Sequence, residues 1–270
     1  MAITTLDGAL AGMMPPVGYA KAVSLALISG QPTSFFTVGG SPGAGTPNTG
    51  LTGANYVSSS VIPAGILYHQ DPPTGDAYLA RLVGVANQAG VLYLCDRLWD
   101  CGPTINVSSA QTISQPTLPA RDATGTTNGS AVQLAIEVVS TTSATAAVIS
   151  ANYTNEVGTA SRAGTFIDLP TSVTAKTGYF YRIGLQSGDH GVRSVQSVTF
   201  STPWTSGTIA LVAYRVLAAV ELVASGVPNA IDALTSGFPQ LFNGVCPFFV
   251  FHPSTTAASS LAGTYTETQG

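Results

Sequence analysis

Residues 131–154 alternate between apolar and polar side chains with a period of two, as strands do when one face of a sheet is buried. If Val139 faces Ala146, the apolar residues form one continuous row. The aligned pairs are Val132 with Tyr153, Leu134 with Ala151, Ile136 with Ile149 and Val138 with Ala147. Because a slip of one residue would turn this row to water, the pattern predicts a β-hairpin in this register.

A second hairpin is predicted for residues 77–100, around the turn residues Asn87–Gly90. If Ala86 faces Val91, the cross-strand pairs are Leu79 with Leu98, Tyr78 with Trp99 and Arg81 with Asp96. Each such pair stabilises a sheet by about 0.2–1 kcal/mol. Arg81 and Asp96 are therefore predicted to form a structural ion pair.

Several further segments have the composition of strands, and one has that of a short helix. Strands are expected within residues 179–185, 192–200, 208–217 and 245–251. The irregular valine spacing in the second of these predicts a β-bulge. Residues 218–224 are compatible with strand or helix, and Asn229 is a candidate cap for a short helix that ends near Ser236.

Strands separated by turn residues, with little helix, predict an all-β fold. The expected architecture is an antiparallel β-sandwich, jelly-roll-like or immunoglobulin-like, with an extended N-terminal arm and one or two short helices. Stretches rich in Gly, Ser, Thr and Pro suggest the boundaries. The predicted parts are an arm (1–53), a first β region (54–115), a Gly/Thr-rich linker or loop (116–130), a β-sandwich (131–252) and a C-terminal tail (253–270).

Charged side chains are scarce. The 270 residues include 9 Lys and Arg and 13 Asp and Glu, so that 8% of the chain is charged and the formal net charge is −4. Ordinary soluble domains have about 25% charged residues. Nucleic acids and anionic membrane surfaces are both bound through clustered cations, so these two partner classes are excluded. A surface so poor in ions is expected to be covered by other subunits.

No targeting segment is expected. A membrane span needs about 20 apolar residues in a row, and the best candidate, residues 209–224, contains Arg215 and Glu221. Residues 1–18 lack the cationic start of a secretory signal, so Sec export is not expected.

The cysteines are odd in number, lack metal-ligand spacing and are interpreted as reduced structural residues: Cys95, Cys101 and Cys246.

Catalytic motifs are weak. Gly39–Gly43 matches the G-x-S-x-G pattern, but its serine precedes Pro42, which lacks the N–H that an oxyanion hole requires. Asp189–His190 is interpreted as an exposed turn, and His69 and His252 as packed loop histidines. The spacing of the acidic residues selects no glycosidase pair among Glu137, Glu156, Asp168 and Glu221. We therefore expect no enzyme activity, no catalytic residue, no metal and no cofactor.

Two runs, Tyr68–Tyr78 and Tyr93–Cys101, are similar to segments of phage virion proteins of unassigned role. Together with the low charge and the many small and hydroxyl residues, the chain resembles structural proteins of tailed-bacteriophage particles, in particular capsid decoration (cement) proteins. The resemblance implies a homo-oligomer, often a trimer, that binds the major capsid protein at the capsid surface after synthesis in the host cytoplasm. It assigns no functional residue.

The arm is our candidate for contacts between subunits, since it mixes apolar runs with glycine-rich joints. The predicted interface residues are Val23, Leu25, Leu27, Phe35 and Phe36. Alternatives are a jelly-roll shell, tail or baseplate protein, a carbohydrate-binding module and a β-sandwich hydrolase. A major capsid protein of the common tailed-phage type ranks lower, because no long amphipathic helix is found. A carbohydrate-binding module predicts an exposed aromatic platform, and a hydrolase predicts a cleft with convergent acids.

Overall fold

The computed structural model describes residues 3, 5–58, 62–143, 149–166 and 174–270, and the side chains of 24–26 lie outside the described part. The chain divides into two compact units. Unit 1 comprises Met1–Gly45, Val57–Asp96 and Val216–Gly270. Unit 2 comprises Thr46–Tyr56 and Arg97–Arg215. Each unit is therefore built from segments that are distant in sequence.

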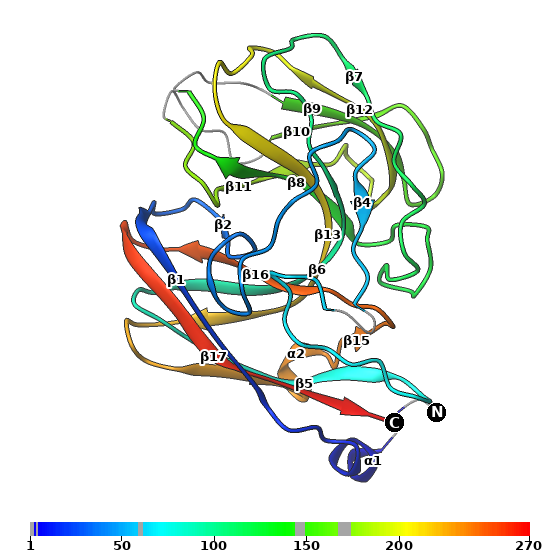
Figure 1. Cartoon of the computed structure of the whole chain (residues 1–270). Coiled ribbons are helices and arrows are strands. Elements are labelled where there is room, and N and C mark those ends of the chain that lie inside the picture. The colour runs from blue at the N-terminus through cyan, green and yellow to red at the C-terminus, as the bar shows by residue number, and fades with distance from the viewer. Residues whose placement is uncertain (1–2, 4, 59–61, 144–148, 167–173) are drawn as a thin grey trace. The chain divides into compact units, whose positions relative to one another are not determined.

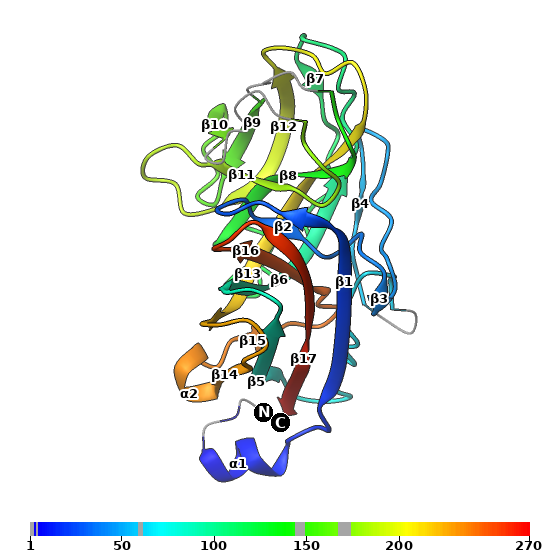
Figure 2. The ribbon, with the colours of Figure 1, turned by 90° about the vertical axis from the view of Figure 1, so that its left-hand side faces the viewer.

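Unit 1 is an antiparallel β-sandwich. Its first sheet has the order β14 (Asn229–Asp232), β5 (Ala77–Ala86), β17 (Ala257–Gln269), β1 (Val17–Leu27) and β3 (Gly40–Ser41), and β15 (Gln240–Leu241) also pairs with β5. Figures 1 and 2 show β5, β17 and β1 side by side. The second sheet contributes β2 (Thr33–Ser34), β16 (Pro247–Pro253) and parts of β6 (Gly90–Cys101) and β13 (Thr208–Leu222).

The core of unit 1 fills the space between these two sheets. Tyr19, Leu261 and Tyr265 come from the first sheet, and Leu92 and Phe249 come from the second. The rings of Tyr19 and Phe249 lie 4.3 Å apart between centroids. Burial of such side chains supplies the main free energy of folding, at about 25 cal/mol per Å² of apolar surface.

Unit 2 is also antiparallel and all-β. Its strands follow the order β13, β8 (Val132–Ser140), β11 (Phe180–Gly184), β10 (Arg162–Phe166), β9 (Ile149–Asn155), β12 (Val192–Phe200) and β7 (Gln111–Thr112). The short strand β4 (Ala54–Asn55) pairs with the end of β6. The predicted bulge in residues 192–200 is confirmed by two register shifts between β12 and β9. Trp99, Trp204 and Tyr153 are at most 1% exposed and belong to the interior.

Two short helices occur in the described residues, as predicted. Helix α1 (Leu6–Ala11) is capped by Thr5 and has no buried residue. Helix α2 (Ala233–Ser236) ends where the sequence indicated, but its cap is Asp232, because Asn229 begins strand β14. No helix in the described residues is long and apolar enough to cross a membrane.

Both predicted hairpins are wrong in their pairing, although their strands are present. Strand β5 lies in the first sheet and β6 in the second, because the chain crosses from one sheet to the other at residues 87–89. Strand β8 pairs with β11 and β13, whereas β9 pairs with β10 and β12. Alternation of apolar and polar residues identifies a strand with one buried face. It does not determine which other strand pairs with it, because several strands have a similar apolar row.

Three of the predicted parts are also integrated into the fold. The tail contains β17, which lies between β5 and β1 inside the first sheet of unit 1. The arm contains β1, which pairs with β17 over most of its length. The Gly/Thr-rich linker forms a closed loop around Asp122, whose carboxylate accepts six hydrogen bonds from backbone and hydroxyl donors of residues 124–130.

Candidate functional site

The predicted interface residues are mostly part of the core. Leu27, Phe35 and Phe36 are at most 2% exposed. Val23 is partly buried and packs against the core of unit 1. The side chain of Leu25 lies outside the described residues. The apolar runs interpreted as contact surface therefore fill the sandwich, since β1 is held between β17 and β3.

The predicted ion pair between Arg81 and Asp96 does not form. Arg81 is exposed on β5 and faces Asp232 of β14 in the first sheet. Asp96 is fully buried on β6 in the second sheet, where its Oδ1 accepts a hydrogen bond of 2.9 Å from the backbone N–H of Cys246. The pairing fails because it required the 77–100 hairpin.

The Asp189–His190 turn is more firmly anchored than the sequence suggested. The Asp189 carboxylate accepts hydrogen bonds from Tyr153, Asn155 and Arg162 at 2.6–2.9 Å. The hydrogen bonds from Arg162, together with those of the two neutral donors, lower the pKa of Asp189. His190 is exposed. These contacts tie the turn to β9 and β10 and bring no nucleophile near the histidine.

The remaining sequence candidates do not assemble a reactive centre in the described residues. Cys95, Cys101 and Cys246 are free and buried, as expected of structural cysteines. No group of three or more His, Cys, Asp or Glu side chains in the described ranges is arranged to hold a metal ion. Ser41 of the G-x-S-x-G match is exposed on β3, and Asp168 lies outside the described residues.

The most distinctive exposed surface lies at one end of unit 1. We call it the N-terminal patch and define it by five exposed apolar side chains: Leu6, Leu10, Met13, Met14 and Tyr68. Leu6 and Leu10 are 72% and 58% exposed on α1. A six-residue helix is not stable in water by itself, so α1 depends on the contacts that the helix and the residue Met13 after it make with β17. The Thr268 hydroxyl donates to the Ala9 carbonyl, and Met13 bridges to Thr268.

A groove of about 280 Å³ adjoins this patch. Met14 and Tyr68 belong to both the patch and the groove. The other lining residues are Pro15, Pro16, Val17, Gln70, Glu267 and Gln269. The groove is therefore walled by the segment before β1, by residues 68–70 and by the end of β17.

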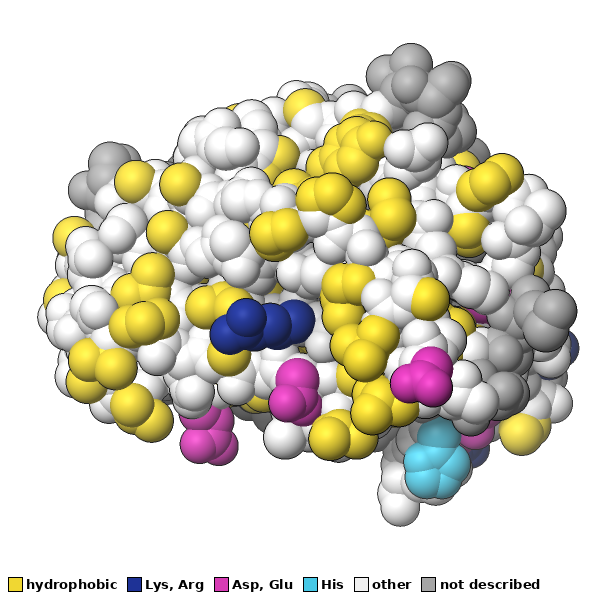
Figure 3. Space-filling view, turned by 90° about the horizontal axis from the view of Figure 1, so that it is seen from below, with side chains coloured by type: hydrophobic (Ala, Val, Ile, Leu, Met, Phe, Trp, Pro, Cys, Tyr) yellow, Lys and Arg dark blue, Asp and Glu magenta, His cyan; other side chains and the backbone are white. Residues whose placement is uncertain are grey.

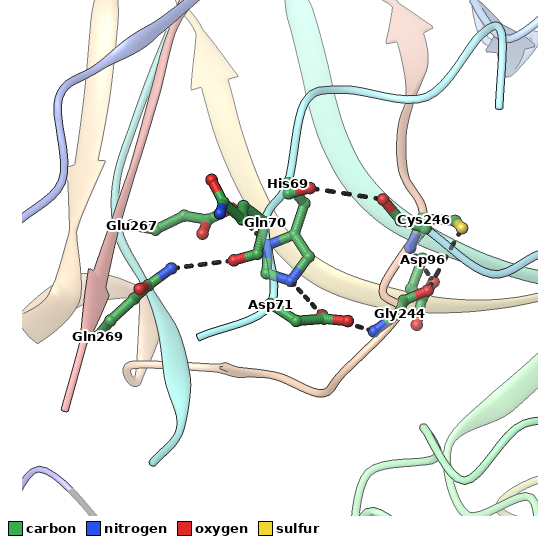
Figure 4. Close-up of polar contacts among 9 residues, drawn as sticks. His69, Gln70, Asp71, Asp96, Gly244, Cys246, Glu267 and Gln269 are labelled. Atoms are coloured by element: carbon green, nitrogen blue, oxygen red, sulfur yellow. Dashed lines mark hydrogen bonds and ion pairs between the residues drawn. The ribbon is translucent and has the colours of Figure 1, made fainter. Parts of the chain in front are cut away.

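A buried histidine lies directly behind this groove, between two carboxylates (Figure 4). The Nδ1 atom of His69 is 2.7 Å from Glu267 Oε1, and its Nε2 atom is 3.0 Å from Asp71 Oδ1. The His69 side chain has no exposed surface, and Glu267 is 6% exposed. His69 and Asp71 precede β5, whereas Glu267 belongs to β17, so the three residues join two distant parts of the chain.

Neighbouring contacts extend this cluster. Asp71 Oδ1 also accepts a hydrogen bond of 2.7 Å from the backbone N–H of Gly244. The Gln269 amide donates to the Gln70 carbonyl at 3.0 Å. Figure 4 shows Cys246 and Asp96 on the side of Gly244, away from Glu267. Residues 69–71 are thus attached both to β17 and to the loop before β16.

The electrostatics of the cluster favour a charged imidazole. Burial alone would lower the pKa of His69, but the hydrogen bond and charge of Glu267, with those of Asp71, outweigh it and raise the pKa above 6.5. The sequence identified His69 as a packed loop residue, which is correct. It did not reveal the partner Glu267, because residues 253–270 were interpreted as a tail.

A second buried ionic cluster lies in unit 2. Arg97 of β6 forms ion pairs with Asp100 and with Glu137 of β8, the latter at 2.8 Å. All three side chains have no exposed surface. Glu137 is enclosed because both faces of β8 are covered along its middle. The cluster is enclosed, so it serves the stability of unit 2.

Comparisons with known proteins identify no family. No family model and no curated protein matches the chain. Among solved structures, the VP2 subviral particle of infectious bursal disease virus has 8% identity and a TM-score of 0.16, covering 96% of this chain and 82% of that one. A structure of the Gx strain of the same virus has 9% identity and a TM-score of 0.17, covering 95% and 81%. Values this low carry no argument about fold or function.

Proposed function

We propose that this chain is a structural protein of a virus particle, and specifically a capsid decoration protein of a tailed bacteriophage. In this proposal it binds copies of itself, as a trimer, and the major capsid protein at the capsid surface, and it performs no catalysis. It is made in the host cytoplasm before assembly. The function is to stabilise the shell through contacts between subunits.

The distribution of charge carries the proposal. The chain has 22 charged residues, of which all but Asp168 belong to the described part, and nine of these are buried. Among the described residues, four charged side chains are exposed: Asp7, Arg81, Glu221 and Asp232. Figure 3 shows a face on which hydrophobic and uncharged side chains predominate. A chain that buries its few ions and exposes apolar groups is suited to contact with protein, since a free soluble surface is normally rich in charge.

The exposed apolar side chains are concentrated in unit 1. Of the eleven large hydrophobic residues that are exposed in the described part, only Val157 belongs to unit 2. The N-terminal patch and its groove supply five of the other ten. Contiguous exposed apolar surface marks interaction sites in soluble proteins. We therefore assign subunit contacts to this patch, in place of the core residues first predicted.

The test compares charge insertions at exposed apolar positions in the two units. Leu6→Glu with Leu10→Glu places two carboxylates in the N-terminal patch, whereas Val157→Glu places one in unit 2, where the side chain is 74% exposed. The wild-type protein is expected to sediment as an oligomer and to co-sediment with particles. The double variant should lose both properties and the Val157 variant should keep them. A wild-type protein that remains monomeric when concentrated would overturn the proposal.

A carbohydrate-binding role receives less support. Stacking on sugar rings needs an exposed aromatic platform, and Tyr68 is the one large aromatic side chain exposed in the described residues. Trp99 and Trp204, the candidates with the largest rings, are at most 1% exposed.

The other virion roles, in a shell, tail or baseplate, are supported by the same scarcity of exposed charge and the same exposed apolar patch. They are distinguished from decoration by which part of the particle retains the protein.

A further inference from the structure

We propose that His69 is a pH-sensitive latch, which holds residues 68–75 against strand β17 when its imidazole is charged and releases them when the charge is lost. We call residues 68–75 the latch segment. This segment connects the buried Leu67 to the start of β5. The inference concerns unit 1 alone and does not depend on the proposed function.

Each of the two short contacts between the His69 ring and a carboxyl group requires one proton, either on the ring nitrogen or on the carboxyl oxygen. Both nitrogens of His69 lie within hydrogen-bond distance of a carboxylate oxygen. A neutral imidazole donates through one nitrogen only, so its other nitrogen would present a lone pair to a carboxylate. The charged form donates to both. When both facing carboxyl groups are ionised, the arrangement therefore selects the imidazolium over the neutral ring.

The charges around the ring make this selection strong. The charged groups that face His69 are Asp71, from its own segment, and Glu267, from β17. The loop before β16 presents the backbone N–H of Gly244 to Asp71 and no charge to the ring. Loss of the imidazolium charge would leave the buried Glu267 carboxylate without a cation, and uncompensated buried charges are strongly destabilising.

Besides the His69 ring, hydrogen bonds to β17 and to neighbouring loops hold the middle of the latch segment. The Gln269 amide donates to the Gln70 carbonyl, the Ser58 hydroxyl donates to the His69 carbonyl at 3.5 Å, and Asp71 accepts from Gly244. Tyr68 is half exposed. Because Tyr68 and Gln70 line the groove beside the N-terminal patch, release of the segment removes one wall of that groove.

The direction of the switch follows from linkage. A histidine with a raised pKa stabilises the closed form fully below its ordinary pKa, near 6.5, and this stabilisation is lost as the pH rises through the raised value. The latch is therefore closed below pH 6.5 and opens as the pH rises through the raised pKa of His69. Each pH unit within this window changes the opening equilibrium by up to about ten-fold.

The first experiment is an NMR titration of the histidine rings. The chain contains three histidines, and the variants His69→Gln and His252→Gln assign their signals. The His69 signal is expected to titrate above pH 6.5. Glu267→Gln removes one facing charge and should shift this midpoint to lower pH by about one unit or more. A wild-type midpoint at or below 6.5 would refute the latch.

The second experiment measures opening directly. Chymotrypsin cleaves after aromatic residues, so the rate of cleavage after Tyr68 reports release of the latch segment. The cleavage rate of a synthetic peptide of residues 62–76 is used to correct for the pH dependence of the protease itself. Above the midpoint that the NMR titration gives for His69, the corrected rate should rise by up to about ten-fold per pH unit. His252→Gln should behave like the wild type. A corrected rate that does not change with pH would contradict the proposal. Because this measurement uses the wild-type protein, the test remains valid even if the His69→Gln variant fails to fold.

Discussion

Arg97 illustrates how a single buried cation compensates two buried carboxylates in unit 2. Its guanidinium group lies between two enclosed carboxylates, and the Tyr56 ring centroid is 5.2 Å from its central carbon. The composition gives a small number of charged residues, but it does not indicate that many of these side chains are buried. A carboxylate on β8 and a cation on β6 become partners only through the sheet pairing, which local patterns do not specify.

Arg97→Leu is expected to lower the free energy of unfolding by about 3–5 kcal/mol, because it leaves Asp100 and Glu137 buried without a cation. Urea unfolding followed by circular dichroism measures the change. Arg81→Leu is the matched control, since Arg81 is exposed on β5, and it should change stability by less than about 0.5 kcal/mol. Equal effects of the two substitutions would show that the enclosed cluster contributes nothing.

Strand β17 shows why the sequence located strands better than it located their partners. Its inward row is Ser259, Leu261, Gly263, Tyr265 and Glu267, in which hydroxyl, glycine and acidic residues interrupt the apolar pattern. This composition is typical of a loop, and it led to the prediction of a tail. Gly263 is required because the Tyr19 ring crosses the strand there: an added Cβ would lie 2.5 Å from the Tyr19 hydroxyl oxygen.

Gly263→Ala is therefore expected to destabilise unit 1 by about 1–3 kcal/mol through overpacking. The added methyl group would also lie 1.9 Å from the Val83 carbonyl oxygen. Gly18→Ala on the adjacent strand β1 is the control, because nothing lies within 4 Å of the added atom. Thermal unfolding of both variants measures the difference. A Gly263 variant as stable as the Gly18 variant would contradict this account of the strand.

The two predicted hairpins failed for a similar reason. The backbone carbonyls at the turn of residues 87–89 form hydrogen bonds with other loops. The Ala86 carbonyl accepts from the N–H of Gly226, and the Ala89 carbonyl accepts from the N–H of Ser254. A short polar connection therefore links two sheets here, although the same residues are typical of a hairpin. The all-β class could be predicted from alternation, whereas the pairings of β5 with β17 and of β6 with β16 join segments more than 100 residues apart.

The molecule as a whole combines a nearly uncharged exterior with ionic clusters inside. Of the candidate site, the sequence predicted the low surface charge and the burial of His69. It did not predict the N-terminal patch, because Leu6 and Leu10 are part of a helix too short to leave a periodic pattern. Their exposure is a property of how α1 is attached to β17, and it follows from the tertiary structure only.

Self-association of the protein should respond weakly to ionic strength, because the exposed surface offers few charges to screen. The dissociation constant measured by sedimentation equilibrium is expected to change by less than about three-fold between 0.05 and 0.5 M NaCl. Ammonium sulfate should strengthen association, as it does for apolar contacts. A steep loss of association with added NaCl would assign the interface to ion pairs and contradict the role of the N-terminal patch.

The central place of β17 has a consequence for synthesis. Residues 257–269 follow every other strand of the first sheet in chain order, yet they lie between β5 and β1. Until residues 257–269 have been synthesised, this sheet lacks its middle strand, and β1 has no long partner to pair with. Translation must therefore pass these residues before unit 1 can close, so an incomplete chain cannot present the finished surface of this unit.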